Sequence, residues 1–127
     1  MPVYTLASRS ASNKDTNQKI ANKITDIHCE TTGAPPEFVN VLFMDNHPLK
    51  GKAELSVTGN VRSGGNRNAE LTDKLRNALM QGIAATAGLS NEQVAVELIG
   101  FPASWGMEGG EILPEPGEEE AWLKRAT

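Results

Sequence analysis

The sequence predicts an α/β (α+β) fold in which two fused β-α-β units build one four-stranded sheet with two helices on one face. Two sequence patterns predict it. Segments typical of strands and helices occur in the order strand, helix, strand, twice over. The same residue types also recur at one constant spacing, which pairs Gly33 with Gly88, Val39 with Val94, Ile20 with Leu75 and Ile24 with Leu79. This spacing indicates a duplicated unit, and right-handed crossovers place each helix over its parallel strands.

The first half begins with a strand over residues 3–8, which are rich in β-forming side chains. Ser12 or Asn13 is placed to cap the helix that follows, and Gly33 is placed to end it. The apolar run over 39–44 predicts the second strand.

The second half repeats this order. Residues 54–61 predict a third strand, and the glycine-rich stretch 63–66 predicts a flexible loop. Asn68 is placed to cap a second helix that ends at Gly88, and 94–99 predict the fourth strand.

The chain is expected to be a single domain over 1–127, with internal repeats at about 2–45 and 54–100 and a C-terminal hairpin or tail at 101–127. One or two helical turns are expected over 118–125, where Trp122 is the only large anchor.

Composition excludes several classes of partner. A formal net charge of −4 with scattered basic residues offers no phosphate-binding stripe, and 5% aromatic residues give little material for base stacking, so we expect no nucleic-acid partner. No apolar run approaches the ~20 residues that span a bilayer. The first residues also lack the pattern of a signal peptide. We therefore expect no membrane partner and a cytoplasmic location.

Cys29 is the only cysteine, which excludes an intrachain disulfide and fits a reducing compartment. Two histidines and one cysteine make no convincing metal site, so we expect neither a metal nor another cofactor.

The face of the sheet away from the helices is expected to be apolar, because the strands at 39–44 and 94–99 are nearly continuous hydrophobic runs. A single chain has nothing to cover that face, and self-association is the simplest remedy.

Pro2 is the first candidate for catalysis. Methionine is commonly removed before a small second residue, which would make Pro2 an N-terminal secondary amine. An α-amino group titrates at about 7.7–8.0, so it can act as a base or an acid near neutral pH. The alternative is that proline at this position only favours removal of Met1.

Arg62 and Arg67 flank the glycine-rich loop and could bind a carboxylate bidentately, or they could be solvated loop residues. His28 is expected to be partly buried near the end of the first helix, where a structural role is the alternative. Adjacent helical positions point about 100° apart, so Cys29 and His28 are not expected to form a catalytic pair.

Three acidic features are also candidates. Glu108 lies near glycines and could approach a site closely, although a solvated loop position is the alternative. Glu97 interrupts an apolar run and is expected to face water, a neighbouring subunit or a site. The run Glu118–Glu120 is expected to be a solvated acidic end.

Together these features resemble the tautomerase superfamily, and within it the cis-3-chloroacrylic acid dehalogenase group. The resemblance covers nearly the whole chain at modest identity. The matching text is Pro2-Val3-Tyr4, Ile24-Thr25-Asp26-Ile27-His28, Thr32-Gly33, Arg62 and Arg67 around the loop, Pro102-Ala103, and Glu108 followed by Leu113-Pro114-Glu115-Pro116-Gly117.

The resemblance implies a homotrimer in which the open sheet faces pack around a central axis. It also implies that Pro2 is the catalytic amine, that Arg62 and Arg67 hold the substrate carboxylate, and that His28 and Glu108 position and activate water. Pro2 would lie beside Arg62. The spacing between the two arginines is longer here than in the dehalogenase, and Glu97 stands where that family carries a tyrosine, which marks a possible specificity position.

The sequence therefore predicts a cofactor-independent enzyme acting on small unsaturated or 2-oxo carboxylates, with hydratase or dehalogenase-like activity on 3-substituted acrylates. One alternative is a keto-enol tautomerase with Pro2 as general base. The other is a non-catalytic oligomeric α/β binding module.

Overall fold

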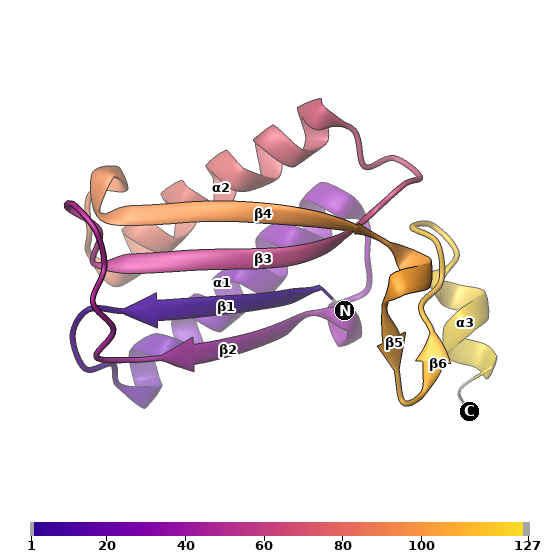
Figure 1. The fold of residues 1–127 in the computed structure, drawn as a ribbon, viewed down its shortest axis with the longest axis horizontal. Coiled ribbons are helices and arrows are strands. Elements are labelled where there is room, and N and C mark those ends of the chain that lie inside the picture. The colour runs from indigo at the N-terminus through magenta and orange to yellow at the C-terminus, as the bar shows by residue number, and fades with distance from the viewer. Residues whose placement is uncertain (1, 126–127) are drawn as a thin grey trace.

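A computed structural model describes residues 2–125 and contains one four-stranded mixed sheet (Figure 1). The strand order is β2-β1-β3-β4, with bounds Asn40–Met44, Val3–Ser8, Leu55–Ser63 and Val94–Pro102. Strand β1 runs parallel to β2, β3 runs parallel to β4, and the two pairs meet through an antiparallel β1–β3 ladder. The predicted strands and fold class are confirmed, although β3 and β4 continue further because their pairing extends through Ser63 and Pro102.

Two long helices connect the paired strands: α1, Lys14–Thr32, and α2, Ala69–Ala87. The side chains of Asn13 and Asn68 cap them by accepting hydrogen bonds from the backbone three residues on, both at 2.8 Å. The helices end at Gly33 and Gly88, whose φ angles of 78° and 72° lie in the left-handed region. The predicted caps and stops are confirmed.

The hydrophobic core lies between the sheet and these helices, which cover the same face (Figure 1). Alternate side chains of the strands point into it, and the helices contribute one stripe each. Its buried members are Tyr4, Leu6, Ile20, Ile24, Leu55, Val57, Val61, Leu75, Leu79, Ile83, Ala84 and Val94.

The opposite face of the sheet is left open within the chain. Leu42, Met44 and Ile99 are exposed there with relative accessibilities of 55%, 38% and 47%. The prediction of uncovered apolar side chains is thus confirmed for these three residues.

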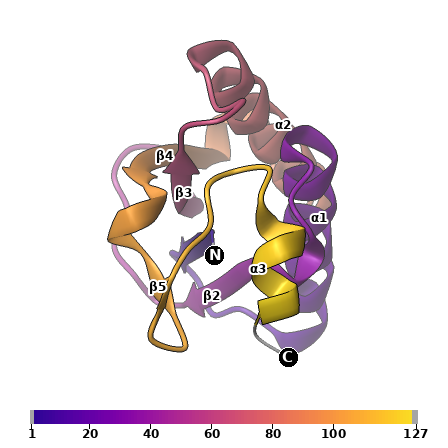
Figure 2. The same ribbon diagram turned by 90° about the vertical axis from the view of Figure 1, so that its right-hand side faces the viewer.

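The C-terminal part forms a hairpin and a short helix, as predicted. The hairpin strands are β5, Met107–Glu108, and β6, Glu111–Ile112, and the helix α3 spans Glu119–Arg125. Three single 3₁₀ turns complete the elements, at Pro36–Phe38, Asn91–Gln93 and Ala103–Trp105. Seen from the end of the sheet, the beginning of β1 appears between the hairpin and α3 in projection (Figure 2).

Within residues 2–125, no helix is both long and apolar enough to cross a membrane. The same residues contain no group of three or more histidine, cysteine or acidic side chains arranged to hold a metal ion.

Candidate active site at the end of the sheet

Pro2 is buried at the start of β1. Its carbonyl oxygen accepts a hydrogen bond of 3.0 Å from the backbone of Asn40, which fixes it to the start of β2. The next residue, Val3, lies opposite Asn60, so Pro2 reaches the end of β3 that carries Arg62. The predicted proximity of this end of β1 to the end of β3 is therefore found. The expected removal of Met1 concerns a residue outside the described range.

His28 lies in the last turns of α1, and its side chain is fully buried rather than partly buried as predicted. Its Nδ1 atom is 2.7 Å from the hydroxyl of Tyr4, which projects inward from β1. Its carbonyl oxygen accepts a hydrogen bond of 2.7 Å from the hydroxyl of Thr32. The start of β1 and the end of α1 thus meet through a polar contact inside an apolar core.

Burial, together with the smaller effects of the positive charges of Arg67 and Arg62, lowers the pKa of His28 to about 3. The imidazole is consequently neutral at ordinary pH. Burial also raises the pKa of Tyr4, against the opposing effect of Arg67, so the phenol keeps its proton.

Arg67 follows the glycine-rich loop and is half-buried. Its backbone amide donates 3.0 Å to the carbonyl of Gly64, which has a φ of 96° that favours glycine. Burial lowers the pKa of Arg67, and the nearby charge of Arg62 acts in the same direction, but a guanidinium stays protonated.

Two nitrogen atoms at this end of the sheet are buried without a hydrogen-bond partner: Nε2 of His28 and Nε of Arg67. Within residues 2–125 they are the only buried side-chain nitrogen or oxygen atoms in this condition. A buried polar atom without a partner is costly, so two of them, one of which belongs to a guanidinium, point to an anionic ligand.

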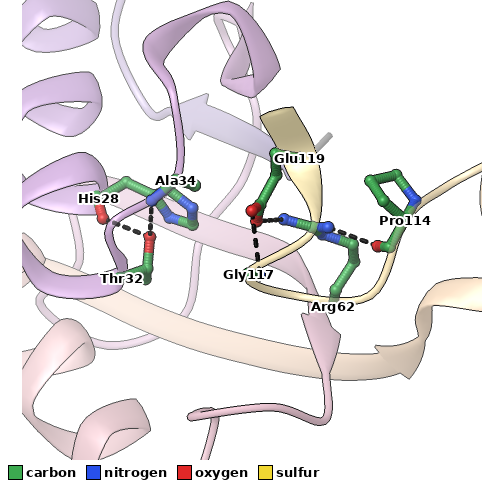
Figure 3. A network of polar contacts seen from close by, with 7 residues as sticks. All are labelled: His28, Thr32, Ala34, Arg62, Pro114, Gly117 and Glu119. Carbon is green, nitrogen blue, oxygen red and sulfur yellow. Dashed lines mark hydrogen bonds and ion pairs between the residues drawn. The ribbon is translucent and has the colours of Figure 1, made fainter. Parts of the chain in front are cut away.

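The guanidinium of Arg62 forms hydrogen bonds within the protein (Figure 3). Its Nη2 donates 2.8 Å to Oε1 of Glu119, and its Nη1 donates 2.6 Å to the carbonyl of Pro114. The guanidinium also lies 5.4 Å from the ring centroid of Phe38. With 2% of its surface exposed, Arg62 is not a solvated loop residue, and both of its terminal nitrogens are engaged.

Glu119 is the counter-ion of Arg62, and its side chain is 9% exposed. The prediction that Glu118–Glu120 form a solvated acidic end is wrong for this residue, because the buried arginine requires an opposite charge. Burial raises the pKa of Glu119, but the hydrogen bonds from backbone amides and Arg62 outweigh it and hold the pKa below its usual range. One of these amides is that of Gly117, which donates 2.9 Å to Oε2.

The C-terminal segment 113–125 therefore packs closely on this end of the sheet. Trp122 meets the ring of Phe38 edge-on, with centroids 5.6 Å apart. A Cβ atom on Gly65 would lie 2.9 Å from the carbonyl oxygen of Pro116, so the loop after β3 touches the segment directly.

The two acidic candidates lie on the hairpin and on β4. Glu108 is half-buried in β5 and pairs in register with Glu111 of the same hairpin. Glu97 is exposed in the middle of β4, opposite Thr58, on the face of the sheet away from the helices. Within one chain, the structure does not bring Glu97 to the buried cluster of Tyr4 and His28.

Sequence reasoning missed the polar roles of Tyr4 and Glu119. Alternation along 3–8 places Tyr4 on the inward face with Leu6, and a buried phenol needs a partner, so a signal for Tyr4 existed. No spacing distinguishes Glu119 from its two acidic neighbours.

No family profile and no curated protein sequence matches the chain. Solved structures do match. N1, a member of the cis-3-chloroacrylic acid dehalogenase family, superposes with a TM-score of 0.83 at 27% identity, covering 96% of this chain and 90% of N1. Native fused 4-OT superposes with a TM-score of 0.76 at 16% identity, and the match covers 87% of this chain and 94% of the fused 4-OT chain.

A third similar structure is a fused 4-OT solved as a symmetric trimer, with a TM-score of 0.71 at 19% identity, covering 87% of this chain and 94% of its own. At these lower identities the likeness establishes a shared fold. With its two β-α-β units, its buried end of β1 and its likeness to N1, the chain has the tautomerase-superfamily fold and resembles the cis-3-chloroacrylic acid dehalogenase family.

Proposed function

We propose that the protein is a cofactor-independent enzyme that uses Pro2, as an N-terminal amine, on small unsaturated or 2-oxo carboxylates. Hydration or dehalogenation of 3-substituted acrylates is the reaction we favour. The likeness to N1 supports this choice of family chemistry.

The observation that carries the proposal is the pair of unpartnered buried nitrogens on His28 and Arg67. His28 lies in the region where β1 begins with Pro2, since Tyr4, two residues further along β1, contacts it directly. Arg67 is near enough for its charge to lower the pKa of His28. A guanidinium N–H and a neutral imidazole can together hold one carboxylate, and charge-assisted hydrogen bonds of this kind are strong. A substrate anion would satisfy both.

In the favoured reaction, Pro2 is cationic and acts as a general acid. Arg67 binds the substrate carboxylate directly and draws electron density toward it, while the charge of Arg62 acts from behind its ion pair with Glu119. Glu108 takes a proton from water as the oxygen attacks C3, and Pro2 delivers a proton to C2. With a halide at C3, the adduct loses hydrogen halide and yields malonate semialdehyde.

A keto-enol tautomerase is the second candidate, and it needs only neutral Pro2 as a base and Arg67 as the carboxylate ligand. A non-catalytic binding module would need neither Pro2 nor a free N-terminus. We therefore distinguish these three candidate functions by measuring activity on three compounds: a 3-haloacrylate, a 2-oxo acid and its enol.

Self-association as a homotrimer is part of the proposal. The trimer would cover three side chains that are exposed on the open face of the sheet, those of Leu42, Met44 and Ile99. A fused 4-OT with the same fold is a symmetric trimer. In such an assembly Glu97, on that same face, would meet a neighbouring chain. Sedimentation at micromolar concentration should give three times the chain mass, and a stable monomer would refute this part.

The experiment for the activity uses purified protein whose intact mass shows that it begins at Pro2. The favoured reaction is supported if the protein releases halide from a 3-haloacrylate and the Pro2→Ala variant does not. Ketonisation of an enol without halide release favours the tautomerase. Inactivity toward all three compounds would leave only the binding module.

A further inference from the structure

Tyr4 is held in one position by the strands around it. It pairs in register with Gly59 of β3, and a Cβ atom at Gly59 would lie only 2.6 Å from Cε1 of the tyrosine ring. The same atom would lie 2.8 Å from Cδ2 of Leu98. Glycine at this position therefore makes the space that the ring fills, and the hydroxyl has little freedom to leave His28.

The contact between Tyr4 and His28 is closed to solvent on both sides. Both side chains are fully buried, and the rings meet edge-on with centroids 5.6 Å apart and an interplanar angle of 74°. The hydroxyl-to-Nδ1 distance of 2.7 Å is that of a good hydrogen bond. Its direction decides where the imidazole proton lies.

Hydrogen-bond satisfaction favours one direction. If the Tyr4 hydroxyl donates to Nδ1, the His28 proton lies on Nε2, and this N–H is the one group of the pair left without a partner. If Nδ1 donates instead, both the phenolic proton and the Nε2 lone pair are left unpaired in the core. The charges of Arg67 and Arg62 act on this imidazole and favour an anion near it, and only a protonated Nε2 can donate to that anion.

We propose that Tyr4 is a positioning residue: its hydroxyl donates to Nδ1 of His28 and so fixes the imidazole proton on Nε2, the atom that the proposed function turns toward the substrate carboxylate. This inference rests on the proposed function, because the accepting oxygen belongs to the carboxylate substrate.

The tautomer can be observed without any substrate. Long-range ¹H–¹⁵N correlation on the ¹⁵N-labelled protein distinguishes a protonated from an unprotonated ring nitrogen, and His47→Gln assigns the spectrum because the chain has two histidines. We expect His28 to show an unprotonated Nδ1 and a protonated Nε2. A protonated Nδ1 would overturn the proposal, whether or not the protein is an enzyme.

Kinetics test whether Tyr4 acts through His28. Tyr4→Phe should lower kcat/KM about 10-fold, the loss expected from a buried hydrogen bond. In a His28→Gln background the amide N–H needs no tautomer control, so adding Tyr4→Phe should change kcat/KM by less than about twofold. Equal losses in both backgrounds would contradict the proposal.

Thr32→Val is the matched control. It removes a buried hydroxyl at the same helix end, one that bonds only to backbone, at His28 and Ala34. It should leave the His28 tautomer and kcat/KM unchanged. If Tyr4→Phe and Thr32→Val behave alike, the effect of Tyr4 is one of general stability and the proposal fails.

Discussion

Arg62 and Glu119 lie 57 positions apart in the sequence and form a buried ion pair with 2.8 Å between Nη2 and Oε1. The pair joins the end of β3 to the helix α3 and thereby holds the C-terminal segment 113–125 over the end of the sheet. The second guanidinium hydrogen bond, to Pro114, fixes the other end of the same segment. Arg62 thus holds the C-terminal segment 113–125 in place. Arg67 is the arginine that has a buried nitrogen without a hydrogen-bond partner.

Glu119→Gln should release this segment. Removing one partner of a buried ion pair costs about 3–5 kcal/mol, because the other charge stays buried without compensation. Since α3 is short and lies at the chain end, we expect local detachment before global unfolding. Amide exchange over 113–125 should accelerate at least about 100-fold while that of α2 stays unchanged. Glu118→Gln, at an exposed neighbour, is the control and should leave exchange as it is.

Folding stability should fall as the pH is lowered from about 6.5 to about 3, because His28 is buried in its neutral form. In this window the unfolded chain binds a proton at His28 and the folded chain does not, so acid favours unfolding, by on the order of 5 kcal/mol in all. Glu119, whose pKa is lowered in the fold, adds to the loss at the acid end.

Urea unfolding at several pH values measures this slope. His28→Gln should flatten it, even if that variant is less stable overall, because the variant has no proton to bind at this position. An unchanged slope in His28→Gln would show that the acid sensitivity arises elsewhere.

Arg67→Ala should raise KM for a carboxylate substrate by about 10–150-fold, the range for a charge-assisted hydrogen bond of about 1.5–3 kcal/mol. An uncharged amide analogue should be a poor substrate of both proteins and respond little to the substitution. Arg76→Ala, which removes a half-exposed arginine paired with Asp73 on α2, is the matched control. An unchanged KM in Arg67→Ala would place the carboxylate elsewhere.

Glu97 tests the proposed assembly as well as specificity. If a neighbouring chain brings Glu97 to the site, its charge opposes the substrate carboxylate, and Glu97→Gln or Glu97→Tyr should raise kcat/KM for 3-haloacrylates. An unchanged kcat/KM in both variants would show that Glu97 lies outside the site.

The fold could be predicted from the sequence because its determinants are local. Asn13 and Asn68 cap helices, Gly33 and Gly88 end them, and apolar runs mark the strands. The order of these elements, repeated once, leaves few ways to arrange the sheet.

The site was only partly predictable, because its contacts join distant segments. The pattern singled out His28 and Arg67, which the structure brings into one charged environment, but it gave no sign that Glu119 would neutralise Arg62. That pairing depends on how the tail returns to the sheet after the hairpin, which no local spacing encodes. Tyr4 was overlooked because a tyrosine in a strand packs well whether or not its hydroxyl has a role.

The most direct test of the enzyme proposal compares two forms of the protein that differ only at the N-terminus. One begins at Pro2, and the other keeps one residue before it, so that the proline nitrogen is an amide; intact mass confirms each. The account predicts turnover of a 3-haloacrylate by the first form and a rate at least about 100-fold lower for the second, since an amide cannot exchange the proton that an amine supplies. Equal rates for the two forms would contradict it.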